Sequence, residues 1–69
     1  MTHITYTITS FTNEGKMFQS IMGLSLADVV AVHDVMQRNG MWHRIETYYE
    51  SLWVDVVHFN RPQGVEVQL

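Results

Sequence analysis

Four histidines are the residues of this sequence best suited to chemistry, because imidazole can exchange a proton or bind a metal near neutral pH. They are His3, His33, His43 and His58. If residues 43–59 form a β-hairpin that turns at Glu50–Ser51, His43 lies directly opposite His58. Such a pair could bind zinc together with one carboxylate, but no carboxylate has the required place in this register. A small-ligand or metal-binding domain that uses His43 and His58 is therefore an alternative hypothesis, and no metal site is predicted.

Patterns for other kinds of catalysis are missing. None of the serines lies in a Gly-x-Ser-x-Gly motif, in which a strained turn exposes the nucleophile. The four glycines are isolated and form no phosphate-binding loop. Glu46 and Asp55 would face each other in the same hairpin, where two carboxylates could share a proton, but solvated surface acids are the simpler interpretation. We expect a protein that is not an enzyme and has no cofactor.

The distribution of charge argues against a nucleic-acid-binding protein. The formal net charge is −3, and the only basic residues, Lys16, Arg38, Arg44 and Arg61, are far apart in the sequence. Binding to phosphates requires clustered cations. Nucleic-acid contact through Arg38, Arg44 and Arg61 is therefore only a second alternative.

The length of 69 residues predicts one domain that spans residues 1–69. The chain has no cysteine, so neither disulfides nor thiolate metal sites can stabilise it. Small domains without such links depend on tight packing or on oligomerisation, and a homodimer is expected. The N-terminus lacks the pattern of a signal peptide, and no stretch approaches the roughly 20 apolar residues of a membrane span. We expect a cytoplasmic protein without membrane contact.

The first half of the chain predicts a β-hairpin. Residues 3–11 alternate β-branched or aromatic side chains with threonine, which is typical of a strand. Thr12–Gly15 is a turn, and residues 16–22 form the return strand. A four-residue loop places Phe11 opposite Lys16. This register puts the following side chains on one face: Ile4, Tyr6, Ile8, Met17 and Ile21.

A helix follows the hairpin. Ser25 is suited to the N-cap, Asp28 complements the positive end of the helix dipole, and Gly40 ends a helix that runs to about Asn39. His33 lies beside the apolar stripe, so we expect it to be partly buried with one ring nitrogen hydrogen-bonded. The stripe itself consists of Leu26, Val29, Val32 and Met36.

The second half is less clear. Residues 41–52 have helical spacing of apolar side chains but a composition rich in strand formers, whereas residues 53–59 are strand-like throughout. We favour a hairpin in which Ile45 is opposite Val56, and a second helix at 41–52 is the alternative. Residues 60–69 are either an edge strand or a frayed tail. The predicted fold is an α+β two-layer ββαββ arrangement, an antiparallel sheet with one helix packed on one face.

Surplus apolar surface is the strongest functional signal. In the predicted hairpin, Tyr48 and Trp53 are cross-strand neighbours, Val57 and Phe59 follow on the same face, and Ile45 belongs to the opposite face. One helix covers only one sheet face, so one apolar face is left exposed or bound to a partner, and the sequence does not tell which. Tyrosine and tryptophan are enriched at interface hot spots. The predicted partner-binding residues are Tyr48, Trp53, Val57 and Phe59.

In size, lack of cysteine and compact order of elements, the chain resembles the small orphan proteins of bacteriophages and other mobile elements. The likeness is limited to these general features and includes no shared motif, so no functional residue is transferred from it. It implies stoichiometric binding to a host protein, for example the inhibition of a host defence system. Together with the surplus aromatic surface, it leads us to expect a non-catalytic protein-binding module that modulates or inhibits a partner protein.

Overall fold

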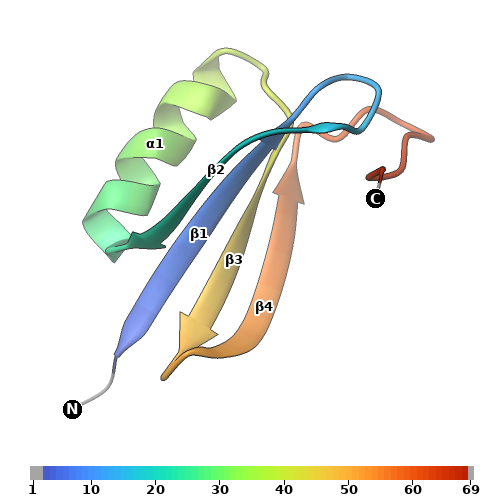
Figure 1. Ribbon diagram of the computed structural model, residues 1–69. Coiled ribbons are helices and arrows are strands. Elements are labelled where there is room, and N and C mark those ends of the chain that lie inside the picture. The colour runs from blue at the N-terminus through green and yellow to red at the C-terminus, as the bar shows by residue number, and fades with distance from the viewer. Residues whose placement is uncertain (1–2, 69) are drawn as a thin grey trace.

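The computed structural model describes residues 3–68, which form one antiparallel sheet and a single helix (Figure 1). The elements are, in chain order, β1 (Ile4–Phe11), β2 (Met17–Leu24), α1 (Leu26–Arg38), β3 (His43–Tyr49) and β4 (Leu52–Phe59). The strand order in the sheet is β2-β1-β3-β4, so β2 and β4 form its edges. The predicted ββαββ architecture is confirmed. The alternative of a second helix at 41–52 is wrong, because β3 occupies most of that segment.

The β1–β2 hairpin forms where the alternation predicts it, but its register differs. Phe11 is opposite Met17 rather than Lys16, and Ile8 is opposite Ile21. Two irregularities in the pairing shift the register along the hairpin, and alternation within one strand does not reveal such shifts. Met17 consequently shares the face of Phe11, and its predicted place beside Ile8 and Ile21 is wrong.

Helix α1 is bounded by the residues that predict its ends. The Ser25 hydroxyl accepts a hydrogen bond from the amide of Asp28 at 3.2 Å, and Gly40 follows the helix with a φ of 65°. Val29 is buried, but Leu26, predicted on the same stripe, is 62% exposed. Helical side chains tilt toward the N-terminus, so the first residue of the helix points past its end. The helix packs mainly on β1 and β2, so it covers about half of the sheet (Figure 1).

The hydrophobic core is divided between the two faces of the sheet. On the side that carries α1, which we call the α1 face, Ile8 of β1 and Val29 of the helix are buried. On the other side, the far face, Phe11 and Trp42 are buried, with ring centroids 4.7 Å apart. A single helix on one face therefore does not account for the whole core.

The β3–β4 hairpin turns at Glu50–Ser51, as predicted. Tyr49 and Leu52 are the last paired residues, so the loop has two residues. Both loop residues have positive φ, 50° at Glu50 and 68° at Ser51, as a tight hairpin loop of this length requires. Neither residue is glycine, asparagine or aspartate, the residues that adopt this conformation most readily, so the turn is strained.

A β-bulge interrupts the β3–β4 pairing. Tyr48 is opposite Trp53, as the predicted register requires, but Val54 is then an extra residue in β4. Beyond the bulge the register moves by one residue, so Ile45 is opposite Val57 rather than the predicted neighbour. Because side chains alternate between faces, this shift exchanges the faces of all later residues of β4.

Residues 60–68 follow the sheet as an irregular tail. The Gln68 amide donates a hydrogen bond to the Gly15 carbonyl oxygen at 2.8 Å, and its side chain donates to Glu14 at 2.7 Å. The Arg61 guanidinium donates to the Glu66 carboxylate at 2.6 Å. The alternative of an edge strand at 60–69 is wrong for residues 60–68, and Leu69 lies outside the described residues. The tail is anchored beside the β1–β2 turn.

Candidate functional site

The four predicted partner-binding residues divide between the two faces of the sheet. Tyr48 and Trp53 are cross-strand neighbours on the far face, as predicted. Val57 and Phe59 instead lie on the α1 face, because the bulge at Val54 reverses the alternation along β4. The prediction that all four residues share one face is therefore wrong, and the far face retains the Tyr48–Trp53 pair.

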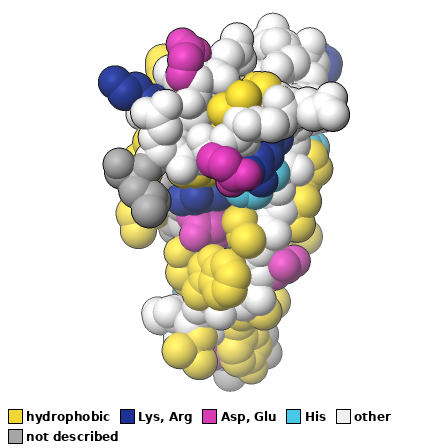
Figure 2. Space-filling view, turned by 90° about the vertical axis from the view of Figure 1, so that its right-hand side faces the viewer, with side chains coloured by type: hydrophobic (Ala, Val, Ile, Leu, Met, Phe, Trp, Pro, Cys, Tyr) yellow, Lys and Arg dark blue, Asp and Glu magenta, His cyan; other side chains and the backbone are white. Residues whose placement is uncertain are grey.

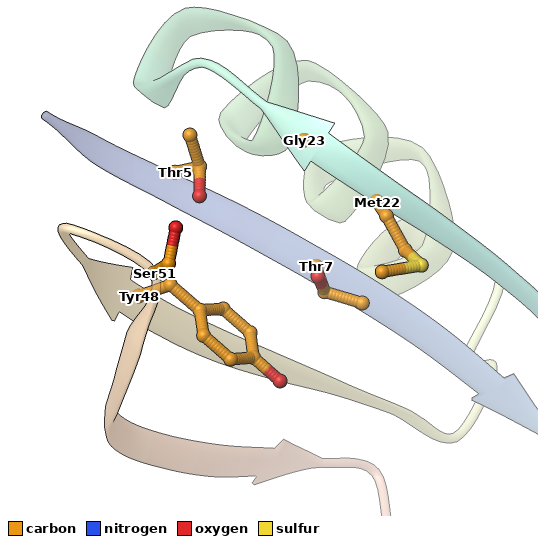
Figure 3. A pocket seen from close by; sticks show the side chains of 6 residues that line it. All are labelled: Thr5, Thr7, Met22, Gly23, Tyr48 and Ser51. Carbon is orange, nitrogen blue, oxygen red and sulfur yellow. The ribbon is translucent and has the colours of Figure 1, made fainter.

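Tyr48 lines an open depression of about 430 Å³ on the far face. In Figure 3 the hydroxyl groups of Thr5 and Ser51 point toward one another, and Met22 lies at the other end of the depression. The complete lining consists of Thr5, Thr7, Met22, Gly23, Tyr48 and Ser51. These residues provide hydroxyl groups and apolar surface without a charged group, which suits an uncharged side chain of a partner protein.

The hydroxyl group of Tyr48 is fixed by a chain of polar contacts. It donates a hydrogen bond to the Glu46 carboxylate at 3.3 Å, and the Arg44 guanidinium lies 3.5 Å from the same carboxylate. Partial burial, followed by the negative charge of Glu46, raises the pKa of Tyr48. The ring is therefore held in place as a neutral hydrogen-bonding group at the wall of the depression.

Apolar surface continues from Trp53 along the β4 edge. Figure 2, which views the molecule from this side, shows hydrophobic side chains gathered over the lower part of the face. Exposed fractions along the strand are 69% for Leu52, 56% for Trp53 and Val54, and 45% for Val57. Asp55 is the only charged residue of β4. Of these residues, Trp53 lies on the far face, whereas Leu52 and Val57 lie on the α1 face, so β4 exposes apolar side chains on both faces of the sheet with little charge beside them.

The other end of the far face is closed. Trp42 is 1% exposed and donates its indole N–H to His58 Nδ1 at 3.1 Å, and the Arg44 guanidinium lies 5.2 Å from the Phe11 ring centroid. Burial lowers the pKa of His58, and the positive charges of Arg61 and Arg44 lower it further. This cluster was not predicted, because it is formed by contacts between segments that lie far apart in the sequence.

A second histidine contact links α1 to the sheet. His33 Nδ1 and His43 Nε2 lie 2.8 Å apart, and His43 Nδ1 donates to the Met41 carbonyl oxygen at 2.7 Å. His43 is fully buried and stacks on Phe59 with ring centroids 5.1 Å apart. Burial lowers the pKa of His43, and the charge of His33 acts in the same direction, whereas the hydrogen bond to Met41 opposes it. The partly buried, hydrogen-bonded state predicted for His33 is confirmed.

The predicted pairing of His43 with His58 does not occur. Arg44 is opposite His58 and Phe59 is opposite His43, so the two imidazoles lie on different faces of the sheet. The shift comes from the same bulge at Val54. Among residues 3–68, no three histidine or acidic side chains are grouped so that they could hold a metal ion. A ligand site built jointly on His43 and His58 is incompatible with this geometry.

The arginines form ion pairs rather than a site. Three arginines lie on different elements, each beside a carboxylate: Arg38 with Asp34 at 3.2 Å, Arg44 with Glu46 at 3.5 Å and Arg61 with Glu66 at 2.6 Å. They do not form the basic patch that nucleic-acid binding requires. The hypothetical carboxylate pair is absent as well, because Val56 is opposite Glu46 and Asp55 is opposite Thr47.

Comparison with known proteins gives no relative from which a role could be transferred. No protein-family model matches the chain, and no curated protein or solved structure shows significant similarity to it. Within the part of the chain that the structure describes, no helix has the length and apolar character to cross a membrane.

Proposed function

We propose that the protein is a non-catalytic binding module that attaches stoichiometrically to a partner protein through the far face around Tyr48 and Trp53. The observation that supports this proposal is the cross-strand Tyr48–Trp53 pair beside an open, uncharged depression, on the side of the sheet away from α1. Tyrosine and tryptophan contribute most to binding when they combine a large apolar area with a fixed orientation.

The strands make this surface rigid before binding. Tyr48 lies in β3, between two hydrogen-bonded neighbours, and its hydroxyl group is held by Glu46. Trp53 is 56% exposed and adjoins the two-residue turn, so a partner can cover most of its ring. A surface that is already ordered loses little conformational entropy on binding, which favours affinity.

Occupation of a partner's surface is the mode of action that such a module can use. A small domain that binds tightly at one face modulates or inhibits its partner by excluding another ligand from the same site. In this proposal the protein belongs functionally with the stoichiometric inhibitors of phages and mobile elements, for example those directed against host defence systems.

The test is capture of the partner by matched variants. Tyr48→Ser and Trp53→Ser alter the far face, and Tyr49→Ser is the control, because Tyr49 is the next residue of β3, is 45% exposed and faces the other way. We expect the wild-type protein and Tyr49→Ser to retain one host protein at near-equal molar ratio. Loss of a hot-spot side chain should weaken binding to the purified partner by about 30-fold or more.

The fold of each variant is checked by circular dichroism and thermal unfolding before binding is compared. Retention of the captured protein by folded Tyr48→Ser and Trp53→Ser would contradict the assignment of the far face. Its loss from Tyr49→Ser alone would place the binding surface on the α1 face.

A further inference from the structure

The chain leaves an unusual share of its apolar side chains in contact with solvent. Among residues 3–68, thirteen large hydrophobic side chains are exposed, whereas four hydrophobic side chains are buried. The accessible surface is 4912 Å², compared with about 4,500 Å² expected for a compact monomer of this mass. A chain of 69 residues without cysteine has few other means of stabilisation. The exposed apolar side chains therefore favour a further interface that completes the fold.

The β4 strand is the edge best suited to this interface. It pairs with β3 on one side, and its other side is the end of the sheet. Exposed edge strands offer unpaired backbone groups to another strand unless charge, proline or bulges prevent it. In β4 the only charged residue is Asp55, no proline is present, and the single bulge lies near the start of the strand. Residues 55–59 form a regular edge.

The opposite edge is less accessible to a further strand. Pairing of β2 with β1 is irregular at two places, and such irregularities twist an edge away from a regular ladder. The strand also leads, after Ser25, directly into α1, which packs on β1 and β2 (Figure 1). Addition of a strand to this sheet is therefore expected at β4.

We propose that β4 pairs in antiparallel orientation with β4 of a second copy, across a two-fold axis near Val56, and so forms a continuous eight-stranded sheet. The proposal does not depend on the proposed function, because it uses the backbone edge of β4 and not the ring of Tyr48. A symmetric dimer uses the same surface of both copies and closes without forming a filament. With this axis, Asp55 lies opposite Val57 of the second copy.

The distribution of charge favours a second copy in antiparallel orientation. Glu50 precedes the strand, and Arg61, whose guanidinium also contacts Glu66 of its own chain, follows it; both residues are exposed. Antiparallel pairing brings Glu50 of each copy toward Arg61 of the other at both ends of the shared ladder. Parallel pairing would place like charges together. At the centre, Asp55 is offset from its symmetry mate, so the pairing places no like charges opposite each other.

The experiment introduces charges of opposite sign at one position. Val57 is 45% exposed and would face Asp55 of the second copy, so Val57→Glu creates repulsion at two symmetric contacts and Val57→Lys creates attraction. Sedimentation equilibrium of the wild-type chain should give twice the 8.1 kDa monomer mass at high concentration. We expect Val57→Glu to raise the dimer dissociation constant by about tenfold or more, and Val57→Lys to preserve the dimer.

Two further variants complete the test. Asp55→Lys combined with Val57→Glu restores the opposite charges and should restore the dimer. Val35→Glu places a charge on the exposed side of α1 and should leave the mass unchanged. A wild-type mass of 8.1 kDa at all concentrations would overturn the proposal. Equal effects of Val57→Glu and Val57→Lys, or dissociation caused only by Val35→Glu, would also overturn it. Partner capture by the Tyr48 variants is measured separately, so either proposal can fail alone.

Discussion

Acidification is expected to destabilise the protein through two histidines that the fold holds neutral. The Met41 carbonyl oxygen can only accept, so His43 Nδ1 carries the proton and Nε2 is left to accept from His33. His58 Nδ1 accepts the indole N–H of Trp42, which can only donate. A second proton on either ring would remove an acceptor that the folded structure uses.

The direction of the effect follows from the lowered pKa values of His43 and His58. Below the unfolded-state pKa of about 6.5, the unfolded chain binds more protons than the folded chain, so the free energy of unfolding decreases as the pH falls. This stabilisation is fully present above about pH 7 and is lost progressively at lower pH. Each histidine contributes a slope of at most about 1.4 kcal/mol per pH unit, or about 2.7 kcal/mol for both. A domain of this size has a total stability of only about 3–10 kcal/mol.

Urea unfolding followed by tryptophan fluorescence, between about pH 8 and pH 5, measures this slope before most carboxylates titrate. His58→Gln keeps a hydrogen-bond acceptor for Trp42 but does not titrate. His43→Phe also removes a titrating group and retains an aromatic ring beside Phe59. We expect each variant to lose part of the pH dependence and the double variant to be nearly flat. A wild-type curve without slope in this range, or a slope that survives in the double variant, would refute the reasoning.

Two further predictions concern backbone conformation. Ser51→Gly removes the backbone strain of a residue with a φ of 68° and should raise the free energy of unfolding by about 0.5–1 kcal/mol. Urea unfolding measures this change. An unchanged or lower free energy of unfolding would contradict the strained turn. Gly15→Ala places a Cβ atom against the Glu66 carbonyl oxygen at a φ of 94°, so it should displace the tail and lower the free energy of unfolding, measured by urea unfolding, by about 1–2 kcal/mol. An unchanged free energy of unfolding in that variant would contradict the close approach of the tail to Gly15.

The features that the sequence predicts correctly depend on neighbouring residues in the chain. Ser25 caps the helix because its hydroxyl group reaches an amide three residues away. The alternation in residues 3–11 needs only the two-residue period of a strand. The turn at Glu50–Ser51 follows from the two strand-like segments that flank it, in spite of its unfavourable residues. Each of these signals is complete within a short stretch of sequence.

The errors arise where one extra residue changes a register. The bulge at Val54 moves Val57 and Phe59 to the α1 face and separates His43 from His58. Nothing in the local sequence marks Val54 as a bulge, because valine is an ordinary strand residue and the bulge is fixed by the fit of β4 against β3. A single insertion thus alters both the candidate binding surface and the histidine contacts.

The closed end of the far face could not be predicted for a different reason. Phe11, Trp42 and His58 are brought together by contacts between distant segments, such as the hydrogen bond from the Trp42 indole to His58. Periodicity within a segment carries no information about such contacts. The presence of a tryptophan in a chain with only two of them is the one local sign that a core lies there.

The central position of β1 has a consequence for how the chain folds. Each hairpin closes a short loop, but pairing of β1 with β3 joins segments separated by about thirty residues, which include the helix. Closure of that loop costs more chain entropy than closure of either turn, so we expect it to be the late, rate-limiting event. Until it occurs, each hairpin exposes one side of a future central strand. Changes at the β1–β3 boundary should therefore govern the speed of folding, and changes at the two turns should affect it less.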